Sequence, residues 1–229
     1  MKHLSVTKAE AFIAQALHAN HVPLVDAKLV AQLMIQSDLV GADGHGIFRL
    51  PAYIKRIRAG GINLSPHIQI EREQGATALI NGDNALGHLV MNRAVDVAIE
   101  KVKKHSVCWV GSHYGNHSGA ASVYVRKLAE QGYIGIYMAV GNANHMAPWG
   151  GIDLLLSTNP IAIAVPAGDK PIVLLDIATT VAAYGKVKLA AQKGESIPDT
   201  WMIDRYGQPI TDPQKSSEGS LLPIGGYKG

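Results

Sequence analysis

The sequence predicts an α/β fold that begins with a helical unit, and three observations support this prediction. The first sixty residues hold three segments with the apolar spacing of helices. After about residue 76, short β-branched or apolar segments alternate with helical ones, which is typical of a layered α/β domain. The 24 glycines, many of them at segment ends, supply the turns. We therefore expect an N-terminal helical unit at 1–75 and an α/β domain at 76–229.

The helical unit opens with segments 7–20 and 26–40, in which apolar side chains recur at helical intervals. Thr7-Lys8-Ala9-Glu10 has the pattern of a capping box and predicts the start of the first helix. A third helix, from about Phe48 to Ala59, ends at Gly60-Gly61. Residues 63–74, with Pro66, form a connecting stretch.

The α/β domain is predicted by apolar segments of strand length that alternate with amphipathic segments of helix length. Lys101–His105 reads as the last turn of a helix, where cations offset the negative end of the helix dipole. Cys108 lies between Val107 and Trp109, which predicts a buried strand and an inert thiol. The expected strands are 76–80, 107–110, 133–140, 161–166 and 172–176, and the expected helices are 86–104, 118–131 and 180–192.

Composition narrows the class of protein. With 47% hydrophobic and 17% charged residues, the 229-residue chain is typical of a compact globule, and its net charge of +3 gives little support for binding nucleic acid. A single cysteine excludes an internal disulfide and fits a cytoplasmic protein. No signal peptide is visible, and the apolar runs are shorter than the ~20 residues that a membrane span needs.

Two short segments carry the chemistry. In 43–49 (DGHGIFR), His45 lies between two glycines and Arg49 follows one helical turn later. In 115–119 (GNHSG), His117 precedes Ser118, which we expect to cap the next helix, so that the helix dipole lowers the pKa of His117. A neutral histidine can exchange a proton near pH 7, and a guanidinium can bind a carboxylate through two hydrogen bonds. Acid–base chemistry on a small carboxylate is therefore expected.

Several other features leave alternatives open. His113, His117 and His145 could form a metal site, which would favour a metal-dependent hydrolase or lyase, although Gly115 argues against one helix carrying the first two. Polar segments 157–160 and 176–180 adjoin apolar strands, where α/β sheets commonly form ligand crevices. Neither the G-x-G-x-x-G dinucleotide fingerprint nor a P-loop is present.

Eight short motifs in this order resemble the type-2 malate/lactate dehydrogenase family, which includes ureidoglycolate, sulfolactate and diketogulonate oxidoreductases. The resemblance runs from the N-terminal helix to the last residue. The motifs are DGHGxxR (43–49), NHSG (116–119), APWGG (147–151), STNP (157–160), DIATT (176–180), YGK (184–186), IPDTW (197–201) and LLPIGGYKG (221–229).

This resemblance implies a dehydrogenase of small 2-hydroxy carboxylates that uses NAD or NADP on a cofactor fold other than the Rossmann type. His117 is then the implied acid–base residue, His45 a second acid–base or orienting group, and Arg49 the carboxylate ligand. Lys228 is implied to reach the cofactor and substrate site. Many relatives have serine at the position of Gly44. The implied cofactor-binding residues are Gly141, Asn142, Thr158, Asn159, Asp176, Ile177, Ala178 and Lys186.

The resemblance also carries expectations about completeness and assembly. In the family the KG of the last motif continues into a further helical segment, so the chain is expected to be a C-terminally truncated fragment with an incomplete fold. Relatives are usually dimers or larger, which implies a homo-oligomer. An inactive truncated paralogue that binds a full-length enzyme is a further alternative.

Overall fold

The computed structural model describes residues 4–141 and 143–228. It contains two compact units, Met1–Gly135 with Val165–Ile172, and Ile136–Ala164 with Val173–Gly229. The boundary that we expected after residue 75 falls inside the first unit, so the N-terminal helices and the first sheet belong to one body. A functional division at that position stays a prediction.

The N-terminal helices form where the sequence predicts them, with ends that differ by one or two residues. Thr7 lies inside the first helix and Ser5 is its N-cap residue, without a capping hydrogen bond from its side chain, so the predicted capping box is wrong. Buried apolar side chains from all three helices, among them Ile13, Met34 and Tyr53, share one core. The bounds are α1 Val6–His18, α2 Leu24–Leu39 and α3 Leu50–Arg58, with 3-10 turns η1 Asp43–His45 and η2 Ile47–Arg49 between the last two.

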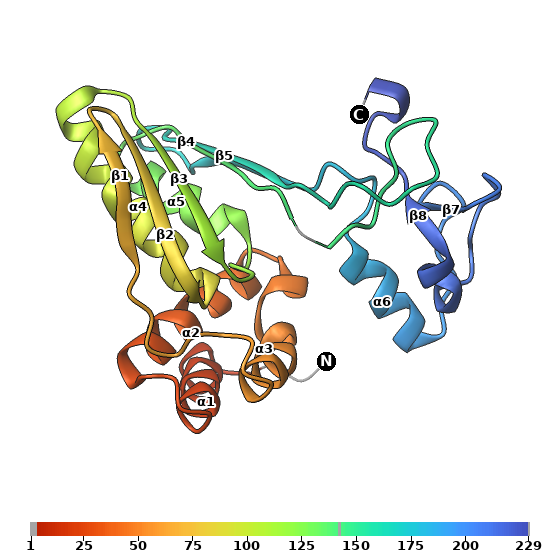
Figure 1. Ribbon diagram of the computed structural model, residues 1–229, viewed down its shortest axis with the longest axis horizontal. Helices are drawn as coiled ribbons and strands as arrows, with labels where there is room; N and C mark the ends of the chain where they lie inside the picture. The colour runs from red at the N-terminus through yellow and green to blue at the C-terminus, as the bar shows by residue number, and fades with distance from the viewer. Residues whose placement is uncertain (1–3, 142, 229) are drawn as a thin grey trace. The chain divides into compact units, whose positions relative to one another are not determined.

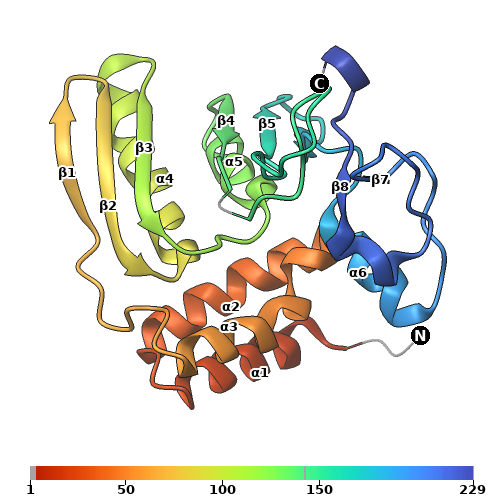
Figure 2. The same ribbon diagram turned by 45° about the vertical axis from the view of Figure 1, so that its right-hand side comes forward.

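A three-stranded sheet packs against the long helix α4 in the same unit (Figures 1 and 2). β2 pairs with β1 in antiparallel and with β3 in parallel fashion, and α4 makes the crossover between the two parallel strands. β1 was expected to be a connecting stretch, and this expectation is wrong. The elements are β1 Gln69–Gln74, β2 Thr77–Ala85, α4 Gly87–His105, β3 Trp109–Gly115 and α5 Ala121–Glu130.

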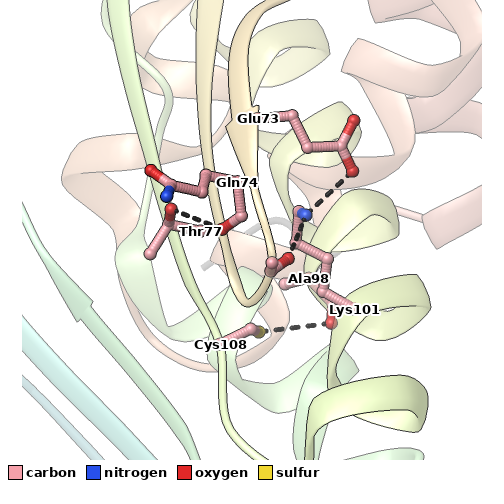
Figure 3. A network of polar contacts seen from close by, with 7 residues as sticks. Glu73, Gln74, Thr77, Ala98, Lys101 and Cys108 are labelled. Carbon is pink, nitrogen blue, oxygen red and sulfur yellow. Dashed lines mark hydrogen bonds and ion pairs between the residues drawn. The ribbon is translucent and has the colours of Figure 1, made fainter.

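A buried lysine ties the β1–β2 hairpin to α4 (Figure 3). The Lys101 ammonium donates to Glu73 Oε1 at 2.8 Å and to the carbonyl of Gly75 at 2.7 Å. Its side chain is only 6% exposed, so these bonds compensate the removal of the charge from water. The basic end of α4 therefore has a structural role beyond its interaction with the helix dipole.

Cys108 precedes β3 instead of lying within a buried strand. Its neighbours Val107 and Trp109 are 72% and 64% exposed, which corrects the sequence prediction. The thiol itself is half-buried against α4, with Sγ 3.3 Å from the carbonyl oxygen of Ala98 (Figure 3). Burial raises the pKa of this thiol, which disfavours the reactive thiolate.

The remaining elements are shorter and belong mainly to the second unit. β4, β5 and β6 form a three-stranded sheet, and β7 pairs with β8 in antiparallel fashion. Around β7 and β8 a small core contains Val187, Met202 and Leu221. The elements are β4 Gly135–Met138, β5 Ile161–Val165, β6 Val173–Ile177, α6 Tyr184–Lys193, β7 Met202–Asp204, η3 Pro213–Glu218, β8 Gly219–Leu221 and η4 Gly226–Lys228. Across residues 4–141 and 143–228, every helix is too short or too polar to cross a membrane.

Candidate active site

The turn that carries His45 is held against the end of α2. The backbone N–H of Ile47 donates to Asp38 Oδ2 at 2.9 Å. A Cβ atom at Gly46 would lie 1.8 Å from Asp38 Oδ1, so a side chain there would displace the carboxylate that accepts from Ile47. Arg49 closes the turn because its Nε donates to the carbonyl of Gly44 at 2.9 Å. These contacts fix the backbone on both sides of His45.

The loop that carries His117 is anchored to the start of α4 and the end of β2. The side-chain amide of Asn116 donates to the carbonyl oxygens of Asn84 and Ala85, each at 2.9 Å. A Cβ atom at Gly87 would lie 1.9 Å from the carbonyl oxygen of Asn116, which requires glycine at this close approach. His117 therefore follows a residue whose position is set by backbone contacts.

The two predicted histidines lie together in the first unit. Their rings stack with centroids 5.3 Å apart and planes 11° apart. Tyr53, a buried residue of α3, lies beside them, with its hydroxyl oxygen 2.6 Å from His117 Nδ1. No sequence motif marks Tyr53 as part of this site. Tyr53 lies four residues after Arg49, and residues at this spacing share a helix face. This spacing could have indicated that Tyr53 lies on the same side as Arg49.

A third histidine, His88, lies behind Tyr53 in the first turn of α4 and was also missed. Its ring meets the Tyr53 ring edge-on, with centroids 5.6 Å apart. His88 is 1% exposed, and within the described part of the chain neither of its ring nitrogens has a hydrogen-bond partner. Gly119, at φ +81°, covers it so closely that a Cβ atom there would lie 2.8 Å from His88 Nε2.

Desolvation favours the neutral forms of His117 and His88. Desolvation lowers the pKa of His117 to about 3 although part of the residue is exposed, and the Arg49 guanidinium acts in the same direction. Burial likewise lowers the pKa of His88 to about 3. Burial raises the pKa of the Tyr53 hydroxyl, and the nearby Arg49 guanidinium opposes this rise. Arg49 is thus close enough to act on both Tyr53 and His117.

The cause of the lowered pKa differs from the one that the sequence suggested. α5 begins at Ala121 with Ala120 as its N-cap residue, so the expectation that Ser118 caps this helix is wrong. The carbonyl of Ser118 instead accepts a hydrogen bond from the Tyr124 hydroxyl. Desolvation and the Arg49 guanidinium, rather than a helix dipole, make His117 a weak base.

Most residues expected to bind a cofactor gather at one end of the β4–β5–β6 sheet, in the second unit. The N–H of Gly141 donates to Asn159 Oδ1 at 3.0 Å, and the carbonyl of Thr158 accepts from the Thr179 N–H at 2.8 Å. Asp176 and Ile177 end β6, and Ala178 follows immediately.

Lys186 is exposed in α6, and Lys228 ends η4. Asn142 lies outside the described residues. The histidines of the metal-site alternative have separate partners. His113 Nε2 lies 2.7 Å from Glu71 Oε2 on the first sheet, and His145 stacks on Tyr184 in the second unit. Among residues 4–141 and 143–228, no cluster of three or more histidine, cysteine, aspartate or glutamate side chains could hold a metal ion.

The fold and the histidine cluster define an α/β protein in which two stacked histidines and an arginine form a candidate acid–base site. Residues 4–229 match the family described as Malate/L-lactate dehydrogenase, and the chain belongs to this family. It is 42% identical over 217 residues to the L-sulfolactate dehydrogenase of Methanothermobacter thermautotrophicus, covering 95% of this chain and 63% of the relative. The malate dehydrogenase of Pyrococcus horikoshii is also 42% identical over 217 residues, covering 94% of this chain and 60% of the relative.

A solved structure of sulfolactate dehydrogenase from Methanocaldococcus jannaschii superposes with a TM-score of 0.88 at 40% identity. The match covers 98% of this chain and 65% of that one. The predicted fold class is therefore confirmed. The chain spans about three fifths of the length of the curated relatives that it matches.

Proposed function

We propose that this protein interconverts a small 2-hydroxy carboxylate and its 2-oxo acid by hydride transfer with NAD or NADP. The observation that carries the proposal is the cluster of His117, His45 and Arg49. It combines a partly exposed histidine, whose lowered pKa favours the neutral imidazole, with a guanidinium close enough to contribute to that lowering. This combination suits a substrate that carries both a carboxylate and an oxygen that exchanges a proton.

Arg49 is the proposed ligand of the substrate carboxylate. Its Nε already donates to the carbonyl of Gly44, which orients the guanidinium. The two terminal nitrogens are then the groups that bind the carboxylate, through paired N–H···O bonds. A carboxylate bound there also offsets the positive charge that lowers the pKa of His117. Substrate binding is therefore expected to make His117 a stronger base.

His117 is the proposed acid–base residue at the substrate oxygen, and His45 orients the substrate or acts as a second acid–base group. Their stacked rings present two imidazoles from two loops that are each fixed by backbone contacts. Such fixed positions favour catalysis because the reacting groups do not have to be ordered during the reaction.

The residues at the end of the β4–β5–β6 sheet fit the chemistry of a dinucleotide. A Cβ atom at Gly141 would lie 2.3 Å from Ser157 Oγ, so any larger residue would have to displace that side chain. Thr158 and Asn159 offer polar groups, and the exposed Lys186 offers a cation of the kind that binds phosphate. We propose that these residues, with Asn142, Asp176, Ile177 and Ala178, hold NAD or NADP, whose nicotinamide accepts or donates the hydride, and that Lys228 contributes to substrate binding.

A coenzyme-binding and turnover experiment tests this proposal. Thermal unfolding of the purified protein is measured with NADH or NADPH, and turnover is then followed with the 2-oxo acids corresponding to malate, lactate and sulfolactate. A coenzyme that binds only the native state at a hundredfold excess over Kd should add about 2.7 kcal/mol of stability. Absence of both a shift and turnover would overturn the proposal.

A further inference from the structure

Two hydrogen-bond donors converge on one nitrogen of His117. The backbone N–H of Gly119 points to Nδ1 at 3.3 Å, and the Tyr53 hydroxyl oxygen lies 2.6 Å from the same atom. A backbone amide can only donate a hydrogen bond. Nδ1 therefore accepts from Gly119, and a nitrogen that accepts carries no proton.

The Tyr53 hydroxyl completes the same arrangement. Because Nδ1 carries no proton, the short contact with Tyr53 requires the hydroxyl to be the donor. Burial raises the pKa of Tyr53, so that the hydroxyl keeps its proton. The tyrosine ring is buried in α3 and packs edge-on against His88, which fixes the direction of the hydroxyl.

We propose that Tyr53 is a positioning residue that, with the Gly119 amide, holds His117 in the tautomer protonated at Nε2. A neutral imidazole has a single N–H, and with Nδ1 accepting two hydrogen bonds that proton is on Nε2. Only the catalytic role of this tautomer rests on the proposed function. The tautomer itself is a property of the protein without substrate.

This tautomer has a consequence for the proposed reaction. An Nε2–H donates a hydrogen bond, which matches the carbonyl oxygen of a bound 2-oxo acid. To accept a proton from a 2-hydroxy acid, Nε2 must first be bare, with the ring proton on Nδ1. Nδ1–H would then donate to the Tyr53 oxygen, whose hydrogen has to turn away, and the Gly119 contact would be lost. The resting site is thus organised for the 2-oxo acid.

The test is NMR spectroscopy of the protein labelled with ¹⁵N-histidine, near neutral pH and without substrate or coenzyme. A His117→Gln variant identifies the signals of His117. We expect the protonated type of nitrogen at Nε2 and the unprotonated type at Nδ1. In Tyr53→Phe, which keeps the ring but loses the hydroxyl, both nitrogens should move toward averaged shifts.

A wild-type spectrum with the proton on Nδ1 would overturn the proposal, and so would a Tyr53→Phe spectrum identical to that of the wild type. If Tyr53→Phe fails to fold, the wild-type spectrum still decides the tautomer. A protein with the Nε2–H form but without dehydrogenase activity would remove the proposed function and leave the tautomer assignment intact.

Discussion

The hydroxyl of Tyr53 lies 2.6 Å from Nδ1 of His117, although the two residues are 64 positions apart in the chain. The contact joins α3 to the loop before α5 and makes the environment of the histidine a property of the folded unit. No short sequence motif contains both Tyr53 and His117. The site is therefore assembled from four segments: the turn with His45, the helix with Tyr53, the start of α4 with His88 and the loop with His117.

His117→Ala is expected to lower turnover about 10²- to 10⁴-fold, because the proposed acid–base group is lost. Steady-state kinetics in both reaction directions measure the effect. His113→Ala is the matched control, since His113 contacts Glu71 on the sheet and is absent from the histidine cluster. Equal losses in the two variants would count against a role for His117 in proton transfer.

Arg49→Lys is expected to raise KM for the 2-oxo acid by about 10- to 100-fold with a smaller change in kcat. Lysine keeps the charge but lacks the planar fork, and it cannot reproduce the bond from Nε to the Gly44 carbonyl. Arg58→Lys, an arginine of α3 that contacts Asn20, serves as the control. A KM that stays at the wild-type value would exclude Arg49 as the carboxylate ligand.

His88→Leu is expected to flatten the dependence of stability on pH in acid. The unfolded histidine takes up a proton as the pH falls through its ordinary pKa of 6.5, whereas the folded one, with a pKa of about 3, does not. The free energy of unfolding therefore falls as the pH drops from 6.5 toward 3. Removing His88 should lessen this slope by about 1.4 kcal/mol per pH unit. Urea unfolding of the wild type and of His88→Leu between pH 4 and 8 measures this slope. If the free energy of unfolding had the same pH dependence in both proteins, the lowered pKa of His88 would be contradicted.

Gly119→Ala is expected to destabilise the protein by more than Gly132→Ala. Both glycines have positive φ, +81° and +85°, so both variants suffer similar backbone strain of about 1 kcal/mol. At Gly119 the added Cβ atom also meets His88 Nε2 at 2.8 Å, whereas at Gly132 nothing lies within 4 Å. Chemical denaturation of the two variants isolates the contact with His88. Equal destabilisation would show that His88 moves aside without cost.

The elements that the sequence predicted well are those whose signal is local. The three N-terminal helices and α4 follow from apolar periodicity, and the His45 and His117 segments follow from short motifs. β1 was not predicted as a strand because it is polar and mostly exposed. It is recognised only through its backbone pairing with β2. Its side chains carry no alternation of apolar and polar residues.

The missing parts of the site have a similar explanation. Tyr53 reads as a core residue of α3, and it becomes part of the site only through its contact with His117. His88 reads as one polar residue in an amphipathic helix, although it is buried without a hydrogen-bond partner among the described residues. Ser118 had the side chain of a helix cap, but the chain turns into α5 two residues later. Sequence patterns do not encode these long-range contacts.

The two glycines beside His45 differ in how well they tolerate substitution. A Cβ atom at Gly46 would collide with Asp38, whereas one at Gly44 would meet nothing within 4 Å. Position 44 can thus take other residues and bring new groups next to His45, while a side chain at position 46 would displace the Asp38 carboxylate that holds the turn. A library aimed at a new substrate range should randomise residue 44 and leave residue 46 unchanged.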